Sequence, residues 1–300
     1  MNIKQPSFEI WMQEPGMDGI YRQVERCGRV CYKSENHVTA ESARPFVERM
    51  IRNQHTAMLE HATVYLLVPL TDDTRDTVTF YQNNRFTHVN MLDAVAYVTT
   101  NLRVLAENDV MANLERYLCE PTAHHERRIT VHFTTQIAIT REFNRHRVDS
   151  VAEQSTRYCN YSKAKFGNEI TVNCPEWVAP LMRNTTGKDS ETSVTLAAEA
   201  FAALARKVAD GQANDYENWL FANIAAERAY LNLTAAGRKP QEARVVLPLD
   251  TNTELVHTAF TSDWKHFFDL RALDKTGPAH PDAKALALPL YEKMKEMKLL

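Results

Sequence analysis

The amino-acid sequence predicts an α+β fold, a single domain in which a small antiparallel-type sheet is packed by helices. Its 300 residues, 44% of them hydrophobic and 24% charged, are enough to bury a substantial core in one large domain or two small ones. Helical patterns outnumber a few separate strand-like runs, which favours an α+β arrangement over a doubly wound sheet. The eight glycines are scattered and form neither a GxGxxG fingerprint nor a Walker loop, so a Rossmann or P-loop fold has no support.

The first 70 residues are expected to form two helices, a loop and a strand. Residues 17–31 and 39–54 have helical patterns, and the second opens with threonine and an acidic residue in its first turn. Residues 55–61, HTAMLEH, are expected to form the loop. Residues 62–70 are dense in β-branched and aromatic side chains and end near Pro69, which suits a strand.

Residues 71–128 are charged and are expected to form a helical insertion. Apolar residues fall at helical spacing through this segment: Met91, Leu92, Val95, Val98, Leu102, Leu105 and Leu114. Residues 128–133 alternate apolar and polar side chains as a half-buried strand does, and this strand is a candidate to pair with residues 62–70. A short helix over residues 135–144 then places Arg141 and Arg145 one turn apart.

The second half of the chain is expected to be helical. Amphipathic patterns predict helices over residues 190–210 and 215–236, and the second ends before Gly237. Pro240 can start a short helix that runs to Arg244. Three more helices are expected at residues 253–260, 263–272 and 282–300.

Composition limits the partners and the location of the protein. The formal net charge of −3 argues against a surface built to hold nucleic acid, although it leaves room for a local basic pocket. No N-terminal segment resembles a signal peptide, and the longest apolar run is far too short to span a bilayer. We therefore expect a soluble cytoplasmic protein that binds neither nucleic acid nor membrane. The five cysteines lack CxxC spacing, so we expect reduced thiols rather than disulfides or a zinc site.

The densest arginine cluster lies in and just before residues 145–158, RHRVDSVAEQSTRY. Its arginines are Arg141, Arg145, Arg147 and Arg157, and the acids that oppose them are Glu142, Asp149 and Glu153. Guanidinium groups suit phosphates because their planar fork donates two parallel hydrogen bonds and keeps its charge. So many arginines would be explained by two phosphate-bearing ligands. The alternative is a solvated, salt-bridged surface, which is roughly three times as common for an arbitrary arginine-rich segment.

This segment resembles the signature of the flavin-dependent thymidylate synthases, the thymidylate synthase complementing protein family. Family members carry one set of residues at fixed offsets, found here as Arg145, His146, Arg147, Ser150, Glu153, Ser155, Arg157 and Tyr158. Three other regions resemble the family: RVCYKSE from Arg29, HTAMLEH from His55, and EARVVLPL and HFFDLRA toward the C-terminus. The resemblance covers the chain except residues 71–128. It implies one domain of this family's fold over residues 1–300, with residues 71–128 inserted.

The resemblance also implies the reaction and its participants. The substrate would be dUMP, the bound cofactor FAD, the one-carbon donor 5,10-methylenetetrahydrofolate, and the reductant NADPH. The residues expected to contact the flavin are His55, Ala57, Arg145, His146, Arg147, Glu153, Ser262 and His266. The residues expected to contact the nucleotide are Glu142, Arg145, Glu153, Gln154, Ser155, Thr156, Arg157, Arg244 and Arg271. Family active sites are built from several subunits, so the resemblance implies a homotetramer. It implies no metal site.

Arg271 receives the catalytic role because of its position in the family pattern. A cation facing the uracil ring stabilises the negative charge that develops as carbon 5 becomes nucleophilic. Taken alone, Arg271 would be an ordinary helix C-terminal cation that interacts with the helix dipole.

Several positions depart from the family pattern. Ala152 and Phe260 stand where the family has asparagine, and Ser262 and His266 replace polar partners of the flavin. Glu142 stands where a glutamine commonly helps hold the substrate phosphate. Because a carboxylate repels a phosphate, we hypothesise that Glu142 instead orients arginines, and the candidates are Arg145 and Arg244.

Other chemical roles remain as alternatives. Cys31 and Cys159 lack a recognisable activating context, so we expect structural roles rather than nucleophilic ones. Ser155 has no histidine close in sequence to act as its base, which favours binding. His55 and His61 have no third zinc ligand nearby. For the whole chain, the alternatives are a non-catalytic nucleotide- or RNA-binding protein and a flavin enzyme that transfers another one-carbon group or uses a modified pyrimidine.

Overall fold

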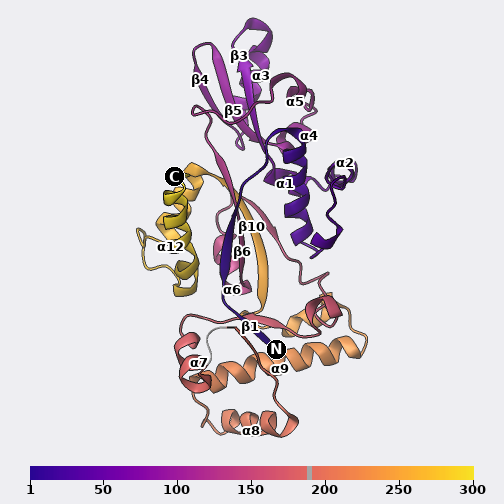
Figure 1. Cartoon of the computed structure of the whole chain (residues 1–300), viewed down its shortest axis with the longest axis vertical. Helices are drawn as coiled ribbons and strands as arrows, with labels where there is room; N and C mark the ends of the chain where they lie inside the picture. The colour runs from indigo at the N-terminus through magenta and orange to yellow at the C-terminus, as the bar shows by residue number, and fades with distance from the viewer. Residues whose placement is uncertain (188–190) are drawn as a thin grey trace.

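Three small sheets follow one another along an elongated molecule (Figure 1). The computed structural model describes residues 1–187 and 191–300. Each sheet packs against its own set of helices and has its own hydrophobic core. The mixed α+β class predicted from the sequence is confirmed.

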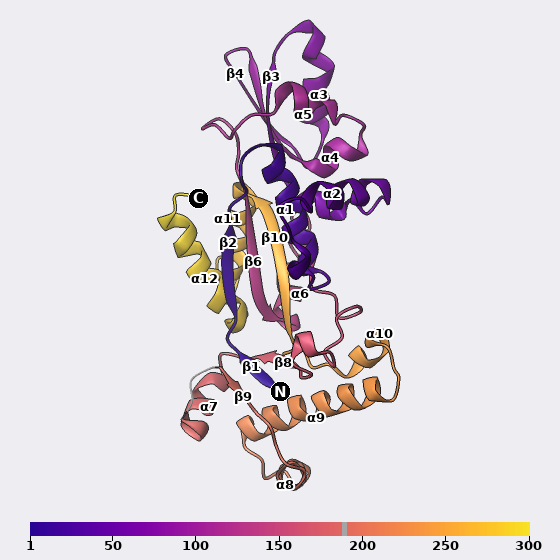
Figure 2. The same ribbon diagram turned by 45° about the vertical axis from the view of Figure 1, so that its right-hand side comes forward.

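The central sheet positions most of the motif residues. Its strands, in spatial order, are β2 (Ser7–Trp11), β6 (Arg128–Gln136), β10 (Asn252–Phe260) and β7 (Ser150–Glu153), and all neighbours are antiparallel. In β10, Leu255 lies opposite Phe133 of β6 on one side and Glu153 of β7 on the other. Helix α1 (Gly16–Val30) covers one face of this sheet and α12 (Pro281–Glu296) lies on the opposite side (Figure 2).

Aromatic packing fixes two short helices against the central sheet. They are α6 (Ile137–Phe143) and α11 (Thr261–Arg271). The rings of Phe133 and Phe143 lie 4.9 Å apart, those of Phe143 and Phe267 lie 5.0 Å apart, and all three side chains are fully buried. Each such pair adds about 0.5–1.5 kcal/mol beyond the burial of its area. This packing brings the C-terminal ends of α6 and α11 together.

A second sheet lies at one end of the molecule. Its strands, in order, are β3 (Thr63–Pro69), β5 (Val95–Asn101) and β4 (His88–Leu92). The helices of this part are α2 (Ala43–Arg52), α3 (Arg75–Asn83), α4 (Leu102–Glu107) and α5 (Ala112–Tyr117), with single 3-10 turns η1 (Glu35–His37), η2 (Thr56–His61) and η3 (Asp72–Thr74). Tyr81 and Leu102 are fully buried in its core.

The third sheet lies at the other end and contains the first residues of the chain. Its strands, in order, are β8 (Thr171–Asn173), β1 (Asn2–Lys4) and β9 (Thr192–Ser193). The helices around it are α7 (Val178–Thr186), α8 (Ala198–Ala209), α9 (Asp215–Ala235) and α10 (Pro240–Ala243), with 3-10 turns η4 (Ala164–Phe166) and η5 (Arg244–Val246). Asn214 and Glu217 form a reciprocal capping box that starts α9.

Two segments predicted as helices are strands. Residues 91–102 belong largely to the β4–β5 hairpin, whose turn places Asp93 and Ala94 at φ 50° and 61°. Consecutive residues with positive φ suit a tight hairpin turn because they match the twist of the flanking strands. The segment predicted as a helix at residues 253–260 is β10, which is held between β6 and β7. The helical interpretation of these two segments is therefore wrong.

The predicted pairing of residues 62–70 with residues 128–133 is also wrong. The strand β3 pairs with β5, and both edges of β6 are taken by β2 and β10. The predicted helix over residues 190–210 is confirmed only as α8, and residue 190 lies outside the described residues. The helices α1, α6, α9, α11 and α12 and the strand β3 lie where the sequence predicts them.

A helix that crosses a bilayer must be both long enough and apolar enough. Within residues 1–187 and 191–300, no helix meets both requirements for a membrane span.

Candidate functional site

Three arginines at the end of α6 carry charge that no described residue neutralises. Arg141, Arg145 and Arg147 are exposed to solvent. None of them forms an ion pair or a side-chain hydrogen bond with a residue in 1–187 or 191–300. These three arginines therefore do not form the salt-bridged surface that was the alternative to a binding site. Uncompensated guanidinium groups at one helix end are suited to bind an anionic ligand.

His146 lies between two of these arginines in the chain, and its ring packs among aromatic and histidine rings. Its ring centroid is 5.0 Å from Phe267, 5.8 Å from His266 and 6.4 Å from His257, and the residue is 8% exposed. Burial, helped by the neighbouring His257, lowers the pKa of His146 to about 4. The ring is therefore neutral at pH 7, and its Nε2 has no partner among the described residues. The structure brings together His146 and His266, two residues predicted to share one ligand.

Arg271 and Glu142 join the ends of the two site helices. Nη1 of Arg271 donates to Oε2 of Glu142 at 2.6 Å, and Nη2 donates to the backbone oxygen of Glu142 at 2.8 Å. The Arg271 side chain is 15% exposed, and its Nε has no partner among the described residues. Glu142 does orient an arginine, but the hypothesis named the wrong partners, since neither Arg145 nor Arg244 bonds to it. The aromatic packing of α6 against α11 explains why Arg271 is the one within reach.

We predict that Glu142→Gln lowers the rate of the reaction that depends on Arg271. A hydrogen bond to a charged group contributes about 1.5–3 kcal/mol, and the neutral amide would leave Arg271 less firmly held. We expect kcat to fall about tenfold, with no gain in affinity for dUMP. Glu48→Gln, at an exposed carboxylate 3.2 Å from Arg44, is the matched control. Much tighter dUMP binding with unchanged kcat would contradict the orienting role.

Glu153 uses its carboxylate within the chain. Oε1 accepts hydrogen bonds from Thr140 at 2.8 Å and Thr253 at 3.4 Å, and Oε2 accepts one from Asn144 at 3.1 Å. Glu153 thus ties α6 to the central sheet. Its predicted contacts with the flavin and the nucleotide stay predictions.

The nucleotide-binding segment predicted after β7 converges with Arg244. Nη1 of Arg244 donates to Oγ1 of Thr156 at 3.3 Å, and Nε of Arg157 donates to Oε1 of Gln241 at 3.2 Å. The backbone N–H of Ser155 donates to the oxygen of Cys31 at 2.9 Å, which holds the turn against α1. The structure therefore gathers two arginines and two hydroxyl residues here. Gln154, in contrast, is buried, 5% exposed.

His55 and Ala57 lie in a separate cavity of about 670 Å³. Residues that line this cavity include Arg29, Cys31, Tyr32, Arg49, Arg103 and Tyr158. Tyr158 is thus the motif residue that reaches it, and its ring lies 5.1 Å from that of Tyr32. Within one chain, the cavity lining includes none of Arg145, His146 or Arg271. The structure does not bring the two predicted groups of flavin residues together in this chain.

The two cysteines weighed as nucleophiles lie in environments that disfavour the thiolate. Burial raises the pKa of Cys31 to about 11 and also raises the pKa of Cys159. The reactive form of a cysteine is the thiolate, so both thiols are poorly activated at pH 7. All five cysteines are free of disulfides.

Residues 71–128 contact the beginning of the site helix α11. Oε1 of Glu126 accepts a hydrogen bond from the backbone N–H of Ser262 at 3.0 Å, and its other oxygen pairs with His88. The His88 ring lies 4.1 Å from Phe260. The departure Phe260 therefore packs against this segment. Sequence reasoning missed these contacts because neither His88 nor Glu126 belongs to a motif.

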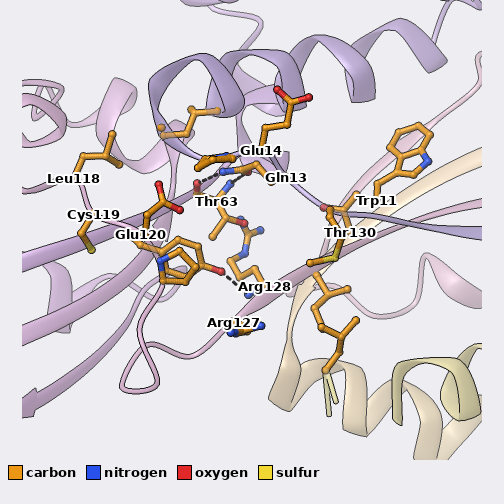
Figure 3. A pocket seen from close by; sticks show the side chains of 18 residues that line it. Trp11, Gln13, Glu14, Thr63, Leu118, Cys119, Glu120, Arg127, Arg128 and Thr130 are labelled. Atoms are coloured by element: carbon orange, nitrogen blue, oxygen red, sulfur yellow. Dashed lines mark hydrogen bonds between the residues drawn. The ribbon is translucent and has the colours of Figure 1, made fainter. Parts of the chain in front are cut away.

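Arg128 is another residue that sequence reasoning missed. Its Nη1 donates to the oxygen of Glu60 at 2.9 Å, and its Nη2 donates to Oγ of the motif residue Ser150 at 2.9 Å. Burial lowers its pKa to about 10. Figure 3 shows Arg128 beside a cavity of about 170 Å³ in which Gln13 is hydrogen-bonded to Thr63. This cavity contains no residue predicted for the site.

Within residues 1–187 and 191–300, no three histidine, cysteine or acidic side chains are grouped as metal ligands would be. The chemistry that the arrangement offers is the binding of anions by arginines, beside neutral imidazole rings and one tethered cation.

The family model described as thymidylate synthase complementing protein matches residues 120–297, more than half of the chain, including the motif and Arg271. No curated protein matches the chain in sequence.

Two solved structures of a UMP/dUMP methylase PolB from Streptomyces cacaoi are similar to this chain. The one bound with 5-Br dUMP has 17% sequence identity and a TM-score of 0.39, and the match covers 99% of this chain and 91% of that chain. The one bound with 5-Br UMP has 16% identity and a TM-score of 0.41, with coverages of 98% and 92%.

Proposed function

Because the chain belongs to the thymidylate synthase complementing protein family, we propose that it is a flavin-dependent thymidylate synthase that methylates dUMP to dTMP. In this proposal, bound FAD, reduced by NADPH, supplies the hydride that completes a methyl group whose carbon comes from 5,10-methylenetetrahydrofolate. The residues of the chain bind and orient these molecules and stabilise developing charge.

The observation that carries the proposal is the unneutralised charge of Arg145 and Arg147 beside His146. A flavin dinucleotide has two linked phosphates, and paired guanidinium forks match their oxygens in charge and geometry. The partnerless Nε2 of the buried His146 adds a neutral group that a ligand can satisfy. His266 is exposed on the same helix as the cation Arg271. These donors fit FAD.

We assign Arg271 the catalytic role. Its guanidinium is held by Glu142, so it needs no rearrangement to face developing charge. Because it is largely buried, it acts at a lower effective dielectric constant than an exposed arginine would. Its partnerless Nε is a donor that a ligand can use. The competing structural role, in which Arg271 only caps α6, predicts an intact reaction after its removal.

We assign the substrate phosphate to Arg244 and the turn after β7. Arg244 and Thr156 are already in contact, and Ser155 and Arg157 lie in the same turn. Their hydroxyl and guanidinium groups supply the neutral and charged donors that a phosphate monoester needs.

We further propose one family domain over residues 1–300, with residues 71–128 inserted, and a cytoplasmic homotetramer. The location of His55 and Ala57 in a cavity apart from His146 supports an active site shared between subunits. If the flavin bridges copies of the chain, both groups can contact one cofactor without meeting in one chain.

Removal of either exposed arginine is expected to weaken flavin binding. Arg145→Ala and Arg147→Ala each remove a charge-assisted contact worth about 1.5–3 kcal/mol, so we expect the Kd for FAD to rise about 10- to 100-fold. The flavin absorbance of the purified variants and a titration with FAD measure this. Arg238→Ala, at an arginine that is 64% exposed, is the matched control and should bind normally.

The flavin spectrum of the unmodified protein tests the proposed function itself. A purified protein without a flavin spectrum, and without one after incubation with FAD, would overturn the proposed function. Retained binding of dUMP under those conditions would favour a non-catalytic nucleotide-binding protein.

A further inference from the structure

Asp149 and His257 form a buried pair next to the arginine turn. Oδ2 of Asp149 lies 2.5 Å from Nε2 of His257, and their side chains are 1% and 0% exposed. Oδ1 of Asp149 and Nδ1 of His257 have no partner among the described residues, so one hydrogen bond joins the pair. A carboxylate buried this deeply is strongly destabilising if its partner is removed. The pair is therefore a firm attachment point.

The pair attaches the arginine turn to the middle of the central sheet. His257 belongs to β10, where it lies opposite Val131 of β6 and Val151 of β7. The backbone N–H of Asp149 donates to the oxygen of His146 at 3.2 Å, which closes a turn with Arg147 at its exposed tip. The turn that carries Arg147 is therefore joined to β10 through the side chain of Asp149.

Two further contacts act on the same turn. His146 is held at its start by the ring of Phe267, and Ser150 is held just after its end by Arg128. The His257 ring itself packs 4.8 Å from Trp264 of α11. Between His146 and Ser150, it is the side chain of Asp149 that fixes the turn to β10.

Resting on the function proposed above, we propose that Asp149 and His257 are positioning residues. They hold the turn so that Arg145 and Arg147 present their guanidinium groups to the diphosphate of the flavin. Preorganised donors bind an anion more tightly because less conformational entropy is lost on binding. The pair touches no ligand itself and acts through the two arginines.

Trypsin provides a direct readout of the turn in the absence of flavin, because it cleaves after exposed arginines. In Asp149→Asn we expect the initial rate of cleavage after Arg147 to rise about tenfold, and the Kd for FAD to rise about tenfold. The conservative His257→Gln keeps an amide donor near the position of Nε2 and should behave much like the unmodified protein.

A matched control separates positioning from general stability. Asp250→Asn removes a carboxylate that accepts a hydrogen bond of 2.6 Å from Trp219. Trp219 belongs to the core of the third sheet and not to the arginine turn. Its stability, measured by urea unfolding, should fall without selective cleavage after Arg147 or weaker FAD binding.

If Asp149→Asn fails to fold, the double variant Asp149→Leu with His257→Phe replaces both partners by apolar groups, so neither position keeps an unpaired polar group. The same increases are expected for it. Cleavage after Arg147 and FAD affinity that match the unmodified protein would overturn the proposal, as would cleavage that rises equally at all arginines. If the unmodified protein binds no FAD, the proposed function fails, while the trypsin comparison still tests the pair.

Discussion

Replacement of Arg271 by alanine is expected to lower the rate of dUMP methylation by at least about 100-fold while FAD stays bound, as for the loss of one preorganised group that stabilises transition-state charge. Arg271 is fixed by Glu142 through two hydrogen bonds of 2.6 and 2.8 Å, so its charge is in place before the reaction begins. The arginines assigned to the flavin, Arg145 and Arg147, are untouched. Steady-state rates and the flavin absorbance of the purified variant measure the two effects separately.

Two further variants sharpen this prediction. Arg271→Lys keeps the charge but loses the planar fork that bonds both acceptors of Glu142, so an intermediate rate is expected. Arg238→Ala removes an exposed arginine with a weak partner and should leave the rate unchanged. Full methylation activity in Arg271→Ala would contradict the catalytic role and leave Arg271 only the role of capping α6.

Acidification from pH 7 to pH 5 is expected to lower the free energy of unfolding by about 4 kcal/mol. Burial lowers the pKa of His61 to about 3 and that of His146 to about 4, both from an ordinary value of 6.5. Below pH 6.5 the unfolded chain binds protons that the folded chain excludes, and at pH 5 each histidine accounts for about 2 kcal/mol. This stability is fully present above pH 6.5 and is lost as the pH falls.

One pair works in the opposite direction. Glu126 raises the pKa of His88, so while Glu126 stays ionised this contact has its full strength below pH 6.5, and it weakens as the pH rises through the raised pKa of His88. His88 is 43% exposed, and solvent screening limits its effect.

Urea unfolding of the ligand-free protein between pH 5 and pH 7 measures the acid effect. His146→Gln should remove about 2 kcal/mol of this pH dependence, because glutamine does not titrate. His37→Gln, at an exposed histidine, is the control and should not change it. Equal free energies of unfolding at pH 5 and pH 7 would contradict the prediction.

The sequence predicted correctly the elements that are long and whose start and end are marked by neighbouring residues. The amphipathic helix α9 has a capping box at its start and a glycine after its end, and both are visible in the sequence. The strands β5 and β10 lack such signals. β10 pairs with β6, more than a hundred residues earlier, and its apolar spacing also fits a helix. Pairing between distant segments, rather than local pattern, decided these structures.

The family offsets give the expected members of the site, which stay predictions, but they do not give the contacts between those residues. Family offsets placed Glu142 and Arg271 in one site, yet only the packing of α6 on α11 reveals that they are bonded. Asp149 stands inside the motif, but its partner His257 lies in the segment that was interpreted as a helix and is the strand β10. The contact of His88 with Phe260 joins the inserted segment to the site and has no sequence signature.

We propose above that this chain methylates dUMP with a bound flavin. This proposal is tested most directly by incubating the purified protein with FAD, NADPH, 5,10-methylenetetrahydrofolate and dUMP and determining the mass of the nucleotide product. We expect dTMP, formed only when all four are present. An unchanged nucleotide, or a product of different mass, would contradict it.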